Sequence, residues 1–197
     1  MKTSIQSNLK MAFTMLELVF VIVIVGILSV MIAPSFNNNN ARKAADQIIS
    51  HIRYTQHLAM MDNKFDPAVG TWFQQRWYIE FVPDPINAGN DIYSIRSNGN
   101  YANNIIDPTK RLTGDSTVNL RTPELDLTAE YGTNLRVTTC GRTLSFDNMG
   151  RPYLINPNAA ATAYVNILQV PCTLTFNDGV NDATIEIQPE TGYVRIQ

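Results

Sequence analysis

Residues 12–34 read AFTMLELVFVIVIVGILSVMIAP, and this stretch decides how the rest of the chain is interpreted. It contains a 21-residue apolar run, Phe13 to Ala33, in which Glu17 is the one formal charge. Because a helix rises about 1.5 Å per residue, the run predicts a helix of about 31 Å, which matches the hydrocarbon thickness of a bilayer. A secretory signal has a shorter apolar region, about 7–15 residues, followed by a small-residue cleavage site. The run therefore predicts a membrane-spanning helix.

The residues before this run carry a second pattern. The leader MKTSIQSNLKMA, residues 1–12, contains Lys2 and Lys10 and no acid, and it ends at Ala12, directly before Phe13 and with Glu17 close behind. This arrangement resembles the class III signal of type IV pilins and type II secretion pseudopilins. The resemblance implies that a prepilin peptidase cleaves between Ala12 and Phe13 and methylates the new terminal amine of Phe13.

The same resemblance assigns roles in assembly to residues of the run. Glu17, Gly26 and Pro34 fall at positions that mark the mature subunits of this family. The sequence departs from the family at Ala12, where Gly is usual, and this departure leaves open whether processing is slowed. Pro34 lacks an N–H and predicts a kink or an end of the helix, and Gly26 weakens the helix in its middle.

Glu17 allows two interpretations. A carboxylate in an apolar helix is expensive, so it is expected to have a partner, and the amine of a processed Phe13, in the same chain or in a neighbouring copy, would supply one. Alternatively, Glu17 is a first-turn glutamate that the helix dipole favours by about 0.3–1 kcal/mol.

Residues 41–61 predict an amphipathic helix that continues the first helix past a break. Apolar side chains recur there at helical spacing on one side: Ala41, Ala45, Ile48, Ile49, Ile52, Ala59 and Met60. His51 and His57 are six residues apart and do not share a helix face, so both are expected at the surface or at an interface rather than in a metal site.

Beyond Met61 the pattern changes to the alternation that is typical of strands. Residues 72–82, WFQQRWYIEFV, and residues 91–96 predict two strands, whereas strands in residues 101–134 cannot be assigned. The final third predicts a series of short strands separated by turns: residues 135–140, 143–147, 151–155, 164–170, 172–176, 183–188 and 193–197. This part predicts one or two antiparallel sheets. The phrases LSFDNMGRPYLI and ATIEIQPETGYVRI look more loosely like the tail of H-type minor pseudopilins.

Cys140 and Cys172 are the two cysteines of the chain. An even count in a domain expected outside the cytoplasm favours a disulfide over two buried free thiols. Such a bridge would contribute roughly 3–4 kcal/mol on the chain-entropy model.

Other candidate sites are weaker. Asp178, Asn181 and Asp182 could offer oxygen ligands to Ca²⁺, but their spacing is not that of an EF-hand, so a solvated turn and no cofactor are expected. With 15 basic and 17 acidic residues the chain has no broad positive footprint, so nucleic acid is a disfavoured partner, although three arginines could form a patch: Arg142, Arg151 and Arg195. The aromatic residues Trp72, Trp77 and Tyr78 are expected to pack in a sheet rather than to bind a ligand. No catalytic motif is visible, so an enzyme is not expected.

The expected fold is α+β, with a long N-terminal transmembrane-plus-amphipathic helix packed on a C-terminal antiparallel β-sheet domain, as in pilins. The expected parts are a leader peptide (1–12), a transmembrane and filament-core helix (13–34), its amphipathic continuation (35–61) and an extracytoplasmic β domain (62–197). The chain is accordingly expected to be a single-pass inner-membrane protein with its C-terminal domain in the periplasm or in a filament.

The expected function is that of a minor pilin-like subunit of a type II secretion pseudopilus or a type IV pilus, for protein secretion or DNA uptake. Its partners would be other pilin or pseudopilin subunits, prepilin peptidase and the inner-membrane assembly platform. The alternative is a signal-anchored periplasmic β domain that binds a ligand or partner without assembling. Which machine the subunit serves stays open.

Overall fold

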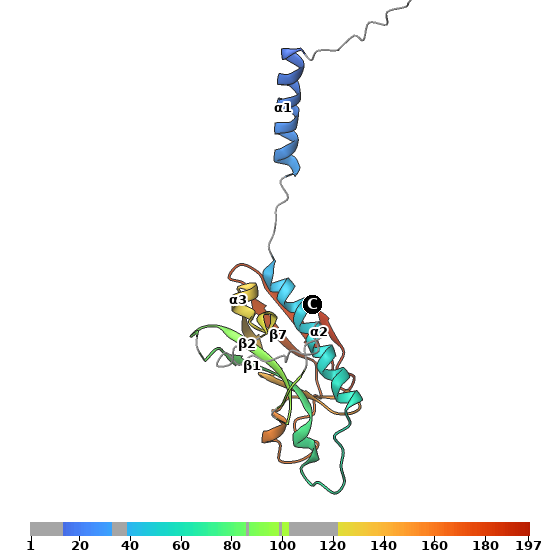
Figure 1. The fold of residues 1–197 in the computed structure, drawn as a ribbon. Helices are drawn as coiled ribbons and strands as arrows, with labels where there is room; N and C mark the ends of the chain where they lie inside the picture. The colour runs from blue at the N-terminus through green and yellow to red at the C-terminus, as the bar shows by residue number, and fades with distance from the viewer. Residues whose placement is uncertain (1–13, 33–38, 86, 99, 103–121) are drawn as a thin grey trace, which may run out of the picture. The chain divides into compact units, whose positions relative to one another are not determined.

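The computed structural model describes residues 14–32, 39–85, 87–98, 100–102 and 122–197. Within these ranges the protein is an α+β fold with three α-helices and two antiparallel sheets (Figure 1). The chain divides into two compact units, residues 1–38 and residues 39–197.

The first unit contains helix α1, Met15–Ile32. Thr14 directly precedes the helix, and its side-chain oxygen accepts a hydrogen bond from the backbone N–H of Glu17 at 3.3 Å. A Thr followed three residues later by a Glu is the sequence of a capping box, which satisfies backbone N–H groups that the first turn leaves without partners. The sequence therefore starts α1 at Met15 by local hydrogen bonding.

The expected long transmembrane-plus-amphipathic helix is wrong. Helix α1 has 18 residues, which at about 1.5 Å per residue is about 27 Å, less than the roughly 30 Å of bilayer hydrocarbon. In the part of the chain that the structure describes, no helix combines the length and the apolar character needed to cross a membrane. The expected single-pass inner-membrane location, with the C-terminal domain in the periplasm, is therefore wrong as well. Ala12, Phe13 and Pro34 lie outside the described residues.

The second unit begins with helix α2, Asn40–Met61, which confirms the amphipathic helix predicted over residues 41–61. The side chain of Asn39 caps this helix by accepting a hydrogen bond from the backbone N–H of Arg42 at 2.8 Å. The buried side of α2 is rich in alanine and isoleucine: Ala41, Ala44, Ala45, Ile48, Ile49, Ile52 and Ala59. The small alanines allow the helix axis to approach the sheets closely.

The first sheet has five strands in the order β3-β2-β1-β5-β6. Its strands are β1, Trp77–Pro83; β2, Asp91–Ser97; β3, Asn100–Tyr101; β5, Thr143–Phe146; and β6, Pro152–Tyr153. Ile79 of β1 faces Ile95 of β2 and Leu144 of β5, so the central strand places apolar side chains next to apolar neighbours. The strand predicted over residues 72–82 begins only at Trp77, because Trp72–Gln75 forms a 3₁₀ turn, η1.

The second sheet has four strands in the order β4-β7-β8-β9. They are β4, Asn134–Thr138; β7, Cys172–Asn177; β8, Asp182–Ile187; and β9, Val194–Ile196. Cys140, shortly after β4, and Cys172 of β7 form the predicted disulfide, with an S–S distance of 2.07 Å. The strand predicted over residues 164–170 is wrong: Asn166 has a positive φ of 57°, and one isolated bridge joins Ile167 to Tyr153.

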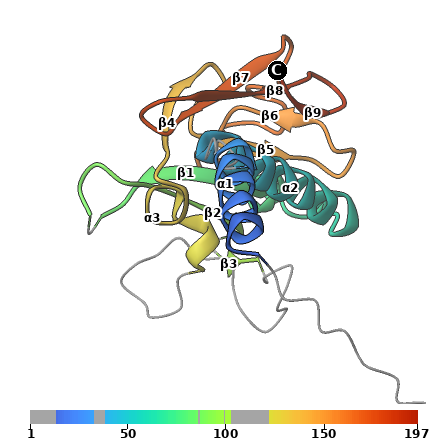
Figure 2. The ribbon, with the colours of Figure 1, turned by 90° about the horizontal axis from the view of Figure 1, so that it is seen from above.

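Helix α2 packs against strands of both sheets, and together they enclose the core of this unit (Figures 1 and 2). Fully buried residues of the core come from the helix and from both sheets, and include Ile48, Ile52, Ile79, Phe81, Phe146 and Phe176. The rings of Phe81 and Phe176 join the two sheets, with centroids 6.0 Å apart. Three short elements complete the unit: η2, Pro123–Leu125; α3, Leu127–Tyr131; and η3, Pro157–Ala159.

Candidate functional site

The surface of α1 is apolar on every face that the structure describes. Its large side chains within residues 15–28 are all exposed, from Met15 at 90% to Ile24 at 46%. Around the helix these side chains include Leu16, Leu18, Phe20, Ile22 and Leu28. A helix that is hydrophobic all round is normally buried, and large exposed apolar surfaces mark interaction sites. Helix α1 is therefore the first candidate site.

Two of the predicted assembly residues lie on this helix. Glu17 is exposed and lies beside Leu16, Phe20, Val21 and Ile24, so its carboxylate is set among apolar side chains. No described cation forms an ion pair with it. Gly26 leaves an open position on the helix surface, because a Cβ added there would meet no atom within 4 Å.

The sequence analysis missed Thr14, although the signal was available. Thr14 and Glu17 have the spacing of a capping box, and the hydrogen bond from Glu17 N to Thr14 Oγ1 is present. The side chain of Thr14 thus caps the start of the helix through the backbone N–H of Glu17.

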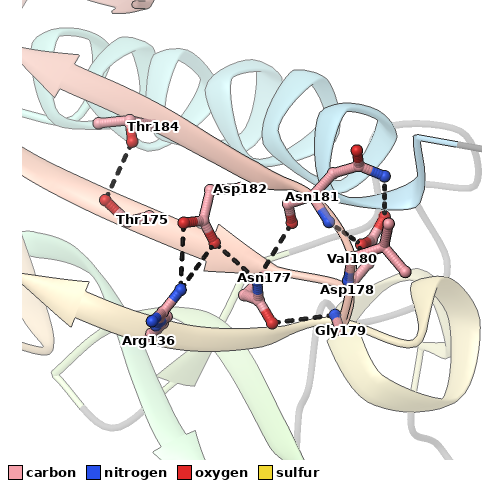
Figure 3. A network of polar contacts seen from close by, with 9 residues as sticks. All are labelled: Arg136, Thr175, Asn177, Asp178, Gly179, Val180, Asn181, Asp182 and Thr184. Carbon is pink, nitrogen blue, oxygen red and sulfur yellow. Dashed lines mark hydrogen bonds and ion pairs between the residues drawn. The ribbon is translucent and has the colours of Figure 1, made fainter.

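The candidate calcium ligands lie in the hairpin between β7 and β8 (Figure 3). Asp178 does not point an unused carboxylate into a cavity: its Oδ1 accepts the backbone N–H groups of Val180, at 3.0 Å, and Asn181, at 2.6 Å. Its Oδ2 accepts the N–H of Ala41, at 3.3 Å, in the first turn of α2. These backbone hydrogen bonds, with that of Asn181 the largest contribution, lower the pKa of Asp178 to about 2.

Asp182, at the start of β8, interacts with other residues than Asp178 does (Figure 3). Its carboxylate accepts from Nδ2 of Asn177 at 2.6 Å and forms an ion pair with Arg136 at 3.1 Å. The carboxylates of Asp178 and Asp182 are therefore not gathered around one point. The described residues contain no group of three or more His, Cys, Asp or Glu side chains that could hold a metal ion. This hairpin is a capped turn that also caps α2.

His51 differs from expectation, because it is buried with 3% of its surface exposed. Its Nδ1 lies 2.8 Å from Oη of Tyr93, and its Nε2 lies 3.2 Å from Nε2 of Gln47. Burial lowers the pKa of His51 to about 4, and the Glu124 carboxylate opposes this shift. His57, on the same helix, is exposed as expected.

The three arginines considered for a nucleic-acid patch are each paired with a different acid. Arg142 lies 3.1 Å from Asp91, Arg151 lies 2.7 Å from Asp147, and Arg195 lies 2.6 Å from Glu186. The structure does not bring them together as one unpaired cationic surface.

The aromatic residues that were considered for ligand binding are mostly used in packing. Tyr78 is 2% exposed, and Nε1 of Trp77 donates to Asp62 at 2.9 Å. Trp72 lies against an arginine that the sequence analysis overlooked, Arg76, whose guanidinium carbon is 5.2 Å from the Trp72 ring centroid. Arg76 also contacts Tyr153 and Ala163, which are distant in sequence, so no local pattern predicts where Arg76 lies.

Comparison of the chain with models of known protein families, with curated proteins and with solved structures finds no match.

Proposed function

We propose that this chain is a pilin-like subunit, of the minor type, that assembles with other such subunits into a filament of the pseudopilus or type IV pilus class. The observation that carries this proposal is α1, whose large described side chains are apolar and exposed all round. Packing among the α1 helices of several subunits would cover more than one face of each helix. The resemblance of residues 12–34 to the prepilin signal supports the same assignment.

Burial of the α1 surface would offset much of the cost of association. Burying one large aliphatic side chain contributes about 1.5–3 kcal/mol. If six such side chains of one helix were covered, the gain would be about 9–18 kcal/mol, comparable to or larger than the roughly 4–15 kcal/mol that association costs. The apolar surface of α1 would therefore supply most of the free energy of association, and a favourable net result would still depend on how Glu17 is paired.

Glu17 would then determine the register of the subunits. A carboxylate that is desolvated among apolar helices needs a cation, or it becomes strongly destabilising. The proposed cleavage between Ala12 and Phe13 would create an amine on Phe13, and a neighbouring subunit could offer that amine to Glu17. The proposed partners are thus prepilin peptidase, the other subunits and the assembly platform, and the role is structural rather than catalytic.

Processing is tested by expressing the full chain with and without a prepilin peptidase and measuring its intact mass. We expect the peptidase to remove residues 1–12 and to add one methyl group to Phe13. A chain that keeps Met1 in the presence of an active peptidase, with a known pilin processed in parallel, would contradict the proposal.

Assembly is tested by oxidative cross-linking of variants that each carry one added cysteine, since the two native cysteines are already bonded to each other. Ile22→Cys in α1 is expected to give cross-linked dimers in the processed protein. Val180→Cys, at the 87% exposed tip of the hairpin, is the matched control and is expected to stay uncross-linked. Equal cross-linking of both variants would indicate random collision and would remove support for the α1 contact.

Two further variants separate the two roles of Glu17. Glu17→Gln keeps a residue that functions in a capping box but removes the charge, whereas Thr14→Ala removes the cap, at about 0.5–2 kcal/mol, and keeps the charge. We expect Glu17→Gln to lose assembly with unchanged helix content by circular dichroism, and Thr14→Ala to lose helix content first. If the two variants assemble equally well, Glu17 does not pair between subunits.

A further inference from the structure

The methionines of the second unit all lie at its surface. Met60, Met61 and Met149 are the three methionines of residues 39–197, and their exposed fractions are 47%, 73% and 68%. Methionine is more often a core residue, where its flexible side chain fills gaps in the packing. An exposed thioether is instead open to oxidants, which convert it to the polar sulfoxide.

Met60 differs from the other two because its sulfur lies at a tight contact. A Cβ built on Gly150, in the turn that follows β5, would lie 3.3 Å from Sδ of Met60 and 3.0 Å from Nε2 of Gln56. Gln56 and Met60 are four residues apart on α2, so they are neighbours on one face of the helix. The sulfur of Met60 and the side-chain amide of Gln56 therefore meet the turn at the same point.

Gln56 connects the end of α2 to two turns. Its Nε2 donates to the backbone oxygen of Gly150 at 2.8 Å and to that of Thr191, between β8 and β9, at 2.8 Å. These two hydrogen bonds use both hydrogens of the amide. The two turns also touch each other, because a Cβ built on Gly192 would lie 2.8 Å from the backbone oxygen of Gly150. One amide group thus joins a helix and two turns that are far apart in sequence.

Oxidation of Met60 would place a competing acceptor beside this amide. The thioether sulfur attacks one oxygen of hydrogen peroxide, the O–O bond breaks and an S–O bond forms. The proton of the transferred oxygen passes to the departing hydroxide, which leaves as water, so the sulfur loses two electrons and the peroxide gains them. A thioether accepts hydrogen bonds only weakly, whereas the sulfoxide oxygen is polar. At Met60 this oxygen would compete with Gly150 and Thr191 for the N–H groups of Gln56.

We propose that Met60 is a redox-sensitive modification site: its oxidation to the sulfoxide by a peroxide draws the Gln56 amide away from the two turns and loosens their contact with α2. Met61 is more exposed but is five residues from Gln56, on a different face of α2, so its oxidation leaves this contact intact. The change is reversible, because methionine sulfoxide can be reduced enzymatically. This inference is independent of filament assembly.

The test treats the full chain with hydrogen peroxide, locates each added oxygen by peptide mapping with fragmentation, and measures amide hydrogen exchange. We expect Met60 to gain one oxygen, more slowly than the more exposed Met61. The informative amides are those of Gly150, which donates to Asp147 at 2.9 Å, and Gly192, which donates to Gln188 at 3.2 Å. Both should exchange about 5–30-fold faster once Met60 is oxidised, as expected for the loss of one or two hydrogen bonds.

Two variants assign the effect to one sulfur. Met60→Leu keeps an apolar side chain of similar size, and its Gly150 and Gly192 amides should be insensitive to peroxide. Met61→Leu, one position further along α2, is the matched control and should respond as the wild type does. Faster exchange in peroxide-treated Met60→Leu would overturn the proposal, as would a Met60 that stays unoxidised when Met61 is fully oxidised.

A second readout needs no variant and decides the question even if Met60→Leu does not fold. The oxidised wild type is treated with enzymes that reduce both epimers of methionine sulfoxide. Slow exchange at Gly150 and Gly192 should return as Met60 loses its added oxygen. Exchange that stays fast after Met60 is reduced, or that never changes although Met60 is oxidised, would contradict the proposal.

Discussion

Acidification is expected to weaken the second unit through His51. Burial lowers the pKa of this imidazole from its ordinary value of 6.5 to about 4, so the unfolded chain takes up a proton at a higher pH than the folded chain does. Stability at neutral pH is unaffected by this group, falls as the pH drops below about 6.5, and levels off below about 4. The fall in the pKa of His51 from 6.5 to about 4 corresponds to about 3 kcal/mol of stability, most of which is lost by pH 4.

The assay is urea unfolding of the full chain at pH 7.5, 6, 5 and 4, followed by tryptophan fluorescence. Because carboxylates also titrate in this range, the informative quantity is the difference in free energy of unfolding between the wild type and His51→Gln, which cannot take up this proton. We expect that difference to fall by about 3 kcal/mol from pH 7.5 to pH 4. His57→Gln, on the exposed side of α2, is the control. A constant wild-type-minus-His51→Gln difference across this range would refute the reasoning.

Three further predictions concern stability. Replacing Cys140 and Cys172 together by serine should lower the free energy of unfolding by about 3–4 kcal/mol, measured by denaturant titration. Gly192→Ala should cost about 1–3 kcal/mol, because Gly192 has a φ of 62° and its added Cβ would lie 2.8 Å from a backbone oxygen; Gly70→Ala, with no atom within 4 Å, is the control and should shift the denaturation midpoint little. Asp178→Ala should speed amide exchange in the hairpin and in the first turn of α2. Because the pKa of Asp178 is lowered to about 2, the protection it gives should persist below pH 3.8 and disappear only as the pH falls through about 2.

The sequence pattern correctly predicted the elements that depend on the spacing of neighbouring residues. Helix α2 was predictable because its apolar residues recur at helical spacing, and strands β7 and β8 were predictable because their side chains alternate in burial around an Asn-Asp-Gly turn. The disulfide between Cys140 and Cys172 followed from an even cysteine count in a β-rich domain, although it was argued from a location that is now corrected.

Interactions between distant residues explain where sequence reasoning failed. His51 lies on the buried side of α2, three residues after Ile48, but a polar residue on that side counts as exposed unless its partner is known, and the partner is Tyr93 on β2. In the same way, the apolar run at residues 164–170 predicted a strand, yet the left-handed backbone at Asn166 interrupts it. Neither the partner nor the interruption is visible in the periodicity.

The apolar run at residues 13–33 illustrates the limit most clearly. Its composition determines that a helix there must be covered by apolar groups, but composition is the same whether the cover is lipid, another domain or other copies of the helix. Length is one property that distinguishes these cases, and α1 has 18 residues, Met15–Ile32, with a cap at Thr14. The second unit has its own core, made by α2 and the two sheets. Under the proposed assembly, the α1 helices of other subunits would cover this surface.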